Sequence, residues 1–185
     1  MKISTKRGDG GETGLLYGGR VPKSDLRCEA YGATDEAISA LGLARALCHD
    51  PWVREFLKEI QRDLFTLGAE LATSSEHYAL FLKHFSPVTS AMIDRLDEVL
   101  GQLEAAISLP RSFIIPGASP GSAALDVGRS TLRRSERRTV DLHERGAIAN
   151  PDVLRYLNRL SDVIFMLARY EDRHLPLDTL TGDSQ

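Results

Sequence analysis

Cysteine is scarce in this chain, and its metal-ligating side chains are not clustered. The two cysteines, Cys28 and Cys48, fall on what the apolar pattern predicts to be one helix. A helical separation of this length corresponds to a rise of about 30 Å, far beyond the reach of a disulfide. The five histidines are scattered, and no Cys or His group has zinc-binding spacing. The sequence therefore predicts reduced, buried cysteines and no metal ion held directly by side chains.

Long apolar runs and net positive charge are also absent. No apolar run approaches the roughly 20 residues that a membrane-spanning helix needs, and residues 1–10 contain no apolar signal core. The formal charge is −3 at pH 7, whereas a general nucleic-acid-binding protein carries a basic footprint. We therefore expect a soluble, cytoplasmic protein that binds neither membrane nor nucleic acid. Its 185 residues fit a single domain over residues 1–185.

Positive charge is nevertheless concentrated in residues 131–141, which have a helical pattern. Four arginines occupy six positions there: Arg133, Arg134, Arg137 and Arg138. Arg133 and Arg137 are four residues apart and share a helical face, on which Asp126 and Arg129 also fall. Such a face either binds a small polyanion or pairs with acidic side chains of neighbouring helices.

Glycine is concentrated in residues 1–24, which we expect to form an N-terminal loop. Six glycines in this stretch cannot hold a helix, but they allow backbone N–H groups to wrap around an anion. Lys6, Arg7 and Lys23 add positive charge, although neither standard phosphate-binding motif is present. The segment is either a flexible tail or a phosphate cradle. The apolar residues 15–17 favour an ordered loop.

Apolar residues at helical spacing predict five helices and no convincing strand, which indicates an all-α five-helix bundle of up-and-down, ferritin-like topology. The first helix follows Asp25 as N-cap and has a heptad seam made mostly of alanine. Small seam residues let a second helix approach closely, and we expect part of this surface to remain for a neighbouring subunit. The second helix is expected from Trp52 to about Thr73, and residues 175–185 as a loose tail. Asp35 in the first helix is either solvated or paired with the arginines.

Three prolines and two glycines exclude a helix between residues 108 and 122. Within this segment Phe113, Ile114 and Ile115 are too apolar for an ordinary surface loop. They either plug the end of the bundle or form one wall of a pocket for an apolar ligand.

Six blocks along the chain resemble the PduO-type ATP:corrinoid adenosyltransferases, and they occur in the order found in that family. They are T-K-R-G-D-G-G-E-T from Thr5, R-V-P-K-S-D from Arg20, A-Y-G-A-T-D-E from Ala30, F-I-I-P-G from Phe113, R-R-S-E-R-R from Arg133, and N-R-L-S-D with L-A-R-Y from Asn158. Each block alone is weak evidence. Together they cover nearly the whole chain and argue strongly against a chance match.

The resemblance implies a homotrimer that transfers the 5′-deoxyadenosyl group of ATP to the cobalt of cob(I)alamin, giving adenosylcobalamin and tripolyphosphate. ATP would bind between subunits, with magnesium carried on its phosphates. A corrinoid reductase and an adenosylcobalamin-dependent enzyme are further partners that it implies. By likeness of motif, the nucleotide-binding residues are Thr5, Lys6, Arg7, Gly8, Thr13, Gly14, Lys23, Arg133, Arg134, Ser135, Glu136, Arg137 and Asn158.

The resemblance also implies catalytic roles for Arg133, Arg137, Asp35 and Phe113. In the family, a phenylalanine matching Phe113 fills the space of the lower axial cobalt ligand. The residues matching Asp35 and Arg133 pair across the subunit boundary. Cob(I)alamin is already a strong nucleophile, so the absence of a Ser/His/Asp or Cys/His set agrees with this chemistry.

Two other functions are compatible with a helical bundle. One is a non-catalytic nucleotide or polyphosphate sensor, but such a protein would not need the corrinoid wall around Phe113. The other is a carboxylate di-iron protein, which requires inward-facing Glu-x-x-His pairs that are absent from this sequence. The chain departs from the family pattern at Ala118, where many members have glycine, and at Asp126, where histidine is common. Asp126 would place an anion on the arginine face.

Overall fold

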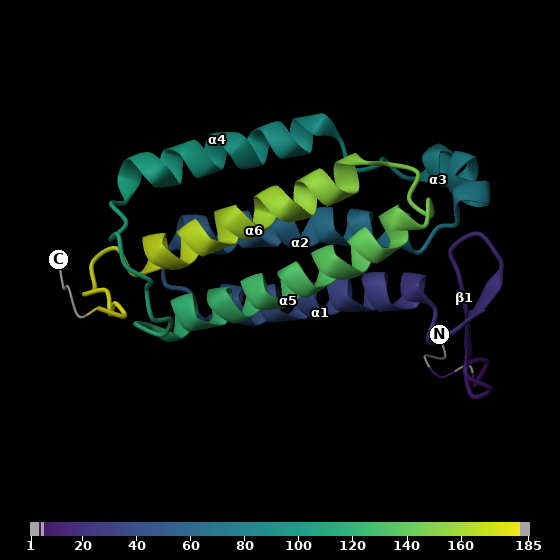
Figure 1. Cartoon of the computed structure of the whole chain (residues 1–185), viewed down its shortest axis with the longest axis horizontal. Coiled ribbons are helices and arrows are strands. Elements are labelled where there is room, and N and C mark those ends of the chain that lie inside the picture. The colour runs from purple at the N-terminus through teal and green to yellow at the C-terminus, as the bar shows by residue number, and fades with distance from the viewer. Residues whose placement is uncertain (1–3, 5, 182–185) are drawn as a thin grey trace.

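The computed structural model describes residue 4 and residues 6–181, and it is an elongated helical bundle (Figure 1). Its five long helices form the body of the molecule, and a 3₁₀ turn, a short helix and a two-stranded hairpin lie at one end. The elements are β1 (Glu12–Gly14), β2 (Arg20–Pro22), α1 (Leu26–Leu47), α2 (Pro51–Leu71), η1 (Ser75–His77), α3 (Tyr78–His84), α4 (Ser90–Ala106), α5 (Pro120–Glu144) and α6 (Asp152–Glu171). The predicted all-α bundle is confirmed.

The helices begin where local chemistry favours their first turns. Asp25 accepts a hydrogen bond from the backbone N–H of Arg27 at 2.8 Å, as predicted for an N-cap. Asp50 caps α2 in the same way, with Pro51 at the first helical position. Ser119 and Ser122 form a reciprocal capping box at the start of α5. These caps fix the starts of α1, α2 and α5, and the predicted site residues Asp35 and Arg133 lie on α1 and α5.

The prediction that the chain has no strand was wrong. β1 and β2 pair antiparallel, with Thr13 opposite Val21, and residues 17–19 between them all have positive φ. Strands of three residues are too short to show the alternation that identifies a strand in sequence. The second helix also ends earlier than expected, at Leu71, because residues 72–73 turn to pair with Leu16 of the hairpin.

Part of the alanine seam of α1 is covered by α5 of the same chain. Ala30, Ala37 and Ala44 are fully buried, and α5 runs antiparallel along them (Figure 1). Glycines on α5 permit this close approach, since a Cβ atom at Gly121 would lie 3.0 Å from the Cα of Cys48. Other seam residues are not fully covered, since Ala40 is half-buried and Leu47 is 38% exposed. The expectation that part of the seam remains for a neighbouring subunit therefore stays a prediction.

Both cysteines are buried and unpaired, as predicted. Burial raises the pKa of Cys48 to about 12, and the nearby carboxylates of Glu171, Asp172 and Asp50 add to the effect. The Cys48 thiol therefore stays protonated at neutral pH. It acts as a small apolar side chain where α1 ends.

Replacing Gly128 by alanine is expected to destabilise the fold by about 1–3 kcal/mol, because overpacking a filled core forces side chains to shift. A Cβ atom there would lie 2.6 Å from Cδ2 of Leu41, which is fully buried. Gly101→Ala is the matched control, since a Cβ at this exposed position of α4 meets nothing within 4 Å. It should stabilise the protein by about 0.5–1 kcal/mol. Urea unfolding of both variants measures the difference, and an equal response would contradict the close packing of α1 and α5.

Candidate active site

The arginines of α5 divide into paired and unpaired side chains. Arg134 forms an ion pair with Glu36 of α1. Arg138 lies 3.7 Å from Glu29 of α1 and 3.6 Å from Asp141. Of the two alternatives predicted for the arginine face, pairing with acidic side chains therefore applies to Arg134 and Arg138.

Arg133 and Arg137 behave differently, although they lie on the same helix. Both are exposed, and neither has a hydrogen bond or ion pair with any described residue. They stand one turn apart on one face, where two like charges repel each other weakly. An anion with several oxygens bound at this face would relieve the repulsion and accept their N–H groups.

Asn158 of α6 is brought to this arginine face. Its Nδ2 donates to Oε1 of Glu136 at 3.0 Å, so Glu136 links α5 to α6 beside the unpaired arginines. Ser135 points the other way. It is fully buried, and its hydroxyl shares a hydrogen bond of 2.7 Å with Thr34 of α1. Ser135 therefore fixes α5 against α1, with its side chain directed away from solvent.

Asp126 does not stand on the exposed arginine face, which corrects the sequence-based expectation. Its side chain is only 7% exposed and forms an ion pair with Arg169 of α6, which is 3% exposed. Nε of Arg129 lies 3.7 Å from the other carboxylate oxygen. Both guanidinium groups also lie over the ring of Phe165, at 4.8 Å for Arg169 and 5.7 Å for Arg129. At this end of α5 the face is covered by α6, so the Asp126 charge is neutralised internally.

The glycine-rich segment is an ordered loop, as its apolar residues suggested. Turns are closed by N–H groups of Asp9 and Gly11, which donate to the carbonyls of Lys6 and Gly8. Lys6 has positive φ, and a Cβ atom at Gly8 would lie 3.1 Å from Nζ of Lys23. The Lys23 ammonium group is thus held over the Gly8 backbone. Thr5, also predicted here, lies outside the described residues.

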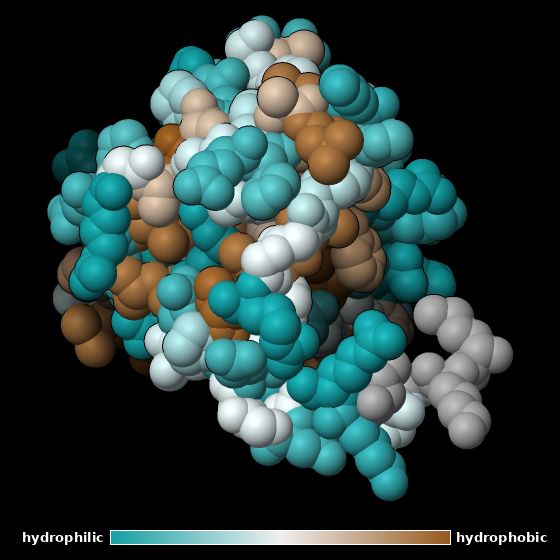
Figure 2. All heavy atoms as spheres, turned by 90° about the vertical axis from the view of Figure 1, so that its right-hand side faces the viewer, coloured by the Kyte–Doolittle hydropathy of each residue, from teal (hydrophilic) through white to brown (hydrophobic). Residues whose placement is uncertain are grey.

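The hairpin carries Thr13 and Gly14 and is attached to the helical bundle. The N–H of Leu16 donates to the carbonyl of Ala72 at 2.9 Å, and the ring of Tyr17 stacks on His84 at 5.7 Å. Figure 2 views this end of the bundle, with hydrophilic side chains predominating around the N-terminal loop at the bottom. The loop therefore has a fixed position beside the start of α1.

Arg27 is a positioning residue that the sequence analysis missed. It is buried, and its guanidinium donates to the carbonyls of Leu71, Thr73 and Ala147 at 2.7–2.8 Å. These bonds join the start of α1 to the end of α2, where the hairpin docks, and to the loop before α6. Burial lowers the pKa of Arg27, against the opposing effect of nearby Asp25. An arginine in the first turn of a helix gives no sequence signal for this role.

Phe113 is 82% exposed, so it does not plug the bundle. The segment around it pairs with residues 178–180, because Leu180 N donates to Phe113 O at 2.9 Å and Ile115 N donates to Asp178 O at 2.8 Å. A cavity of about 650 Å³ lies beside Phe113 and is also lined by Leu109 and Leu180. This arrangement favours the interpretation as a pocket wall. It also gives the expected loose tail an ordered place as far as residue 181.

One chain does not bring all the predicted residues together. The N-terminal loop lies at one end of the bundle and residues 107–119 at the other (Figure 1). Along α5 alone, about 20 Å of helix separates Pro120 from Arg133. Asp35 is exposed in the middle of α1 and has no ion pair with a described residue. The nucleotide motifs and the Phe113 wall are thus separate in a single copy.

Comparison with known proteins identifies the family. A family model described as cobalamin adenosyltransferase matches residues 3–171. The chain belongs to the cobalamin adenosyltransferase family. A corrinoid adenosyltransferase of Mycobacterium tuberculosis (strain H37Rv) is 41% identical over 176 residues, covering 91% of this chain and 87% of the relative. The Salmonella typhimurium corrinoid adenosyltransferase PduO is 38% identical over 172 residues, covering 93% of this chain and 50% of the relative.

Solved structures agree with this assignment. Two are variants of a PduO-type adenosyltransferase from Lactobacillus reuteri. One, complexed with cobalamin and ATP, has a TM-score of 0.86 and 33% identity over 100% of this chain and 98% of its own. The other, complexed with ATP, has a TM-score of 0.83 and 34% identity over 92% of this chain and 94% of its own. The resemblance inferred from the six sequence blocks is therefore confirmed.

The described residues of this chain contain no group of three or more His, Cys, Asp or Glu side chains that could hold a metal ion. Among the same residues, no helix is long and apolar enough to cross a membrane.

Proposed function

We propose that this chain transfers the 5′-deoxyadenosyl group of ATP to the cobalt of cob(I)alamin. The observation that carries the proposal is the unpaired Arg133–Arg137 face, next to Asn158, in a member of the cobalamin adenosyltransferase family. A face of unpaired arginines suits a reaction in which the protein must stabilise departing phosphates, because the Co(I) nucleophile itself needs no activation. The exposed Phe113 beside its cavity supplies a place for the apolar corrin.

In the proposed reaction, the Co(I) electron pair forms a bond to C5′ of ATP. The C5′–O bond breaks, and its electron pair leaves with tripolyphosphate. Negative charge grows on the leaving group, and Arg133 and Arg137 stabilise it by charge-assisted hydrogen bonds. The N-terminal loop adds backbone N–H groups and Lys23. The tasks of the protein are therefore to hold C5′ in line with cobalt and to stabilise the departing phosphates.

Magnesium enters as a companion of ATP. Since Mg²⁺ keeps several waters and commonly binds through substrate phosphates, the chain needs no carboxylate cage for it. When bound, the ion neutralises part of the triphosphate charge. A corrinoid reductase that supplies Co(I) and an enzyme that uses adenosylcobalamin complete the proposed partners, because Co(I) must be generated and the product consumed.

The function is tested by incubating the protein with ATP, magnesium and chemically reduced cobalamin, and following the visible spectrum. Formation of adenosylcobalamin, with tripolyphosphate released in equal amount, supports the proposal. Samples without ATP and without protein are the controls. Tight ATP binding with no adenosylated product would favour the sensor alternative.

We further propose that the working unit is a homotrimer with ATP at subunit interfaces. The separation of the loop from the Phe113 wall in one chain, together with the exposure of Asp35, Arg133 and Arg137, supports completion of the site by another copy. Light scattering of an active sample should give three times the chain mass of 20.4 kDa. A monomeric mass in a fully active sample would rule this out.

Asp35 of one chain is proposed to orient Arg133 of the next. Asp35→Asn and Arg133→Ala should each lower kcat/KM and weaken the oligomer, because removing one partner leaves the other charge uncompensated. The free-energy loss of the double variant should be smaller than the sum of the losses of the two single variants, because that sum counts the one shared contact twice. Glu36→Gln, beside Asp35 but paired within the chain with Arg134, is the matched control and should show no coupling to Arg133→Ala. Additive losses for Asp35 and Arg133 would disprove the pairing.

A further inference from the structure

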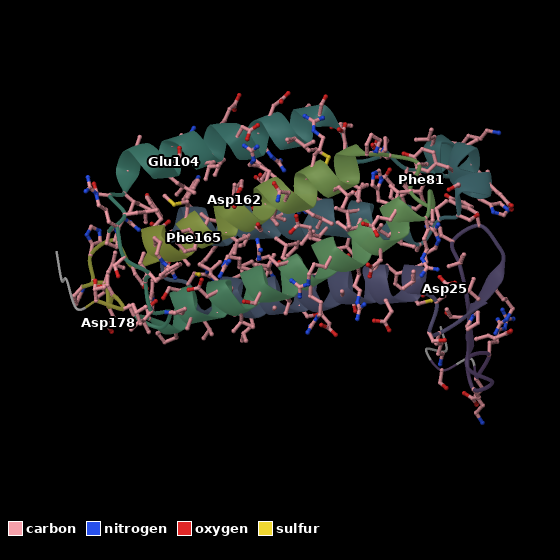
Figure 3. All side chains as sticks on the ribbon, viewed as in Figure 1. Asp25, Phe81, Glu104, Asp162, Phe165 and Asp178 are labelled. Carbon is pink, nitrogen blue, oxygen red and sulfur yellow. The ribbon has the colours of Figure 1, made fainter. Side chains whose placement is uncertain are left out.

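A second cavity lies at the end of the bundle that carries Phe113. It has a volume of about 210 Å³ and lies between the residues that follow α4 and those that follow α6. Figure 3 shows this end on the left, where Asp178 is labelled. The cavity and the larger one at Phe113 share Pro110, and they contact successive residues of the C-terminal segment, Thr179 and Leu180. They are therefore neighbouring spaces.

A buried carboxylate with an unused hydrogen-bonding atom lines the smaller cavity. Asp172 is 2% exposed, and its Oδ1 has no hydrogen-bond partner within the part of the chain that the structure describes. It stands at the C-cap of α6, where the helix dipole adds negative potential. Glu171 next to it is already engaged by the backbone N–H groups of His49 and Asp50. Oδ1 of Asp172 thus lacks the donor that a buried carboxylate oxygen normally has.

The same cavity is lined by two guanidinium groups. Arg169 is buried and uses Nη2 in its ion pair with Asp126, and its Nε and Nη1 have no hydrogen-bond partner among the described residues. Arg173 donates to the carbonyl of Tyr170 and to the carboxylate of Asp50. The lining of one cavity therefore includes both an unused acceptor and guanidinium donors.

These charges exclude two classes of ligand. A cation would meet two arginines, and an anion would meet the unpartnered Asp172. A neutral group that both donates and accepts hydrogen bonds satisfies both sides, and a primary carboxamide does so at one planar end. Apolar wall residues, Ile107, Leu175 and Leu177, suit the methylene part of a short arm. The volume is below the roughly 300–1,000 Å³ of pockets that take whole drug-sized ligands, so a side arm fits better than a ring system.

We propose that this cavity binds one peripheral carboxamide arm of the corrinoid, with its NH₂ on Asp172 and its carbonyl on Arg169. The inference rests on the proposed function, because cobalamin carries acetamide and propionamide arms around its corrin ring. A ring placed against Phe113 would extend its rim toward Pro110 and Thr179, where the smaller cavity begins. Asp172 is then a specificity-determining residue that selects amidated corrinoids over those with a free acid at that arm.

The test compares cobalamin with cobalamin monocarboxylates, in each of which one peripheral amide is hydrolysed to an acid. For one of them, KM for the corrinoid should rise roughly tenfold or more, because two carboxylates then face each other in a buried site. The KM for ATP should stay the same. Asp172→Asn should abolish this discrimination, since an asparagine amide can donate to the acid. Asp178→Asn, an exposed acid of the same segment, is the matched control and should retain it.

Equal KM values for cobalamin and every monocarboxylate would overturn the proposal, and this wild-type comparison stays decisive if Asp172→Asn does not fold. Discrimination that persists in a folded Asp172→Asn protein would also overturn it. A change in KM for ATP alone would assign the cavity to the nucleotide instead. If the protein forms no adenosylcobalamin, the proposed function fails. Equilibrium dissociation constants for the same corrinoids, measured by absorbance, then test the cavity separately, and equal constants would overturn it.

Discussion

Arg137→Ala is expected to lower kcat/KM for ATP by about a hundredfold or more, the effect of removing one preorganised donor from a developing negative charge. The thermal unfolding temperature should hardly change, because Arg137 is exposed and has no ion pair with a described residue. Alanine is at least as good a helix former as arginine, and the repulsion with Arg133 that is lost is weak, so neither effect lowers the stability of α5. Steady-state kinetics and thermal unfolding of the same preparation measure both effects.

Arg138→Ala is the matched control for this experiment. Arg138 is the next residue on α5 and is also exposed, but it lies near Glu29 and Asp141 within the chain. Its removal should leave kcat/KM within about a factor of two of the wild-type value, a ratio worth about 0.4 kcal/mol. If Arg137→Ala were equally mild, the unpaired arginine face would not be the phosphate site.

Phe113→Ala is expected to separate two assays of the same reaction. With cob(II)alamin and a reductant, turnover should fall about tenfold further than with pre-reduced cob(I)alamin, a difference of about 1.4 kcal/mol in barrier height. The proposed role of the ring is to displace the lower axial ligand before reduction, a step that pre-reduction bypasses. The KM for ATP should change little, since the apolar ring of Phe113 offers no hydrogen-bond donor to the phosphates.

Ile115→Ala controls for general damage to this segment. Ile115 is also exposed, and its backbone N–H bond to Asp178 does not depend on the side chain. Ile115→Ala should lower the turnover in both assays by a similar factor, and by less than Phe113→Ala does. If Phe113→Ala lowered turnover equally in the two assays, the ring would have no role in displacing the lower axial ligand and would only pack against its neighbours.

The long helices could be predicted because each repeats apolar residues over several turns. The hairpin could not, since its strands have three residues each and its pairing depends on a turn at residues 17–19. Similarly, Arg133 and Arg134 are adjacent in sequence, but only Arg134 points toward an acid on α1. Spacing identified the arginine helix, whereas the partner of each arginine depended on which helices lie beside it.

Asp126 shows the same limit more sharply. Helical spacing placed it on the arginine face, but its environment is decided by Arg169, which is far away in sequence on α6. The C-terminal segment was expected to be loose because it is short and polar, yet its backbone pairs with residues 113–115. Backbone pairing between short segments leaves no periodic signal in composition or hydropathy. Both features required the tertiary structure.

The close packing of α1 on α5 has a thermodynamic consequence for ligand binding. With Gly128 against Leu41 and Ser135 bonded to Thr34, the backbone that carries Arg133 and Arg137 has little room to move. The entropy lost on binding a polyphosphate is then confined mostly to the two arginine side chains, at about 0.5–1.5 kcal/mol each. The helix pair thus holds the site in its binding geometry beforehand, and affinity depends on side-chain ordering more than on helix movement.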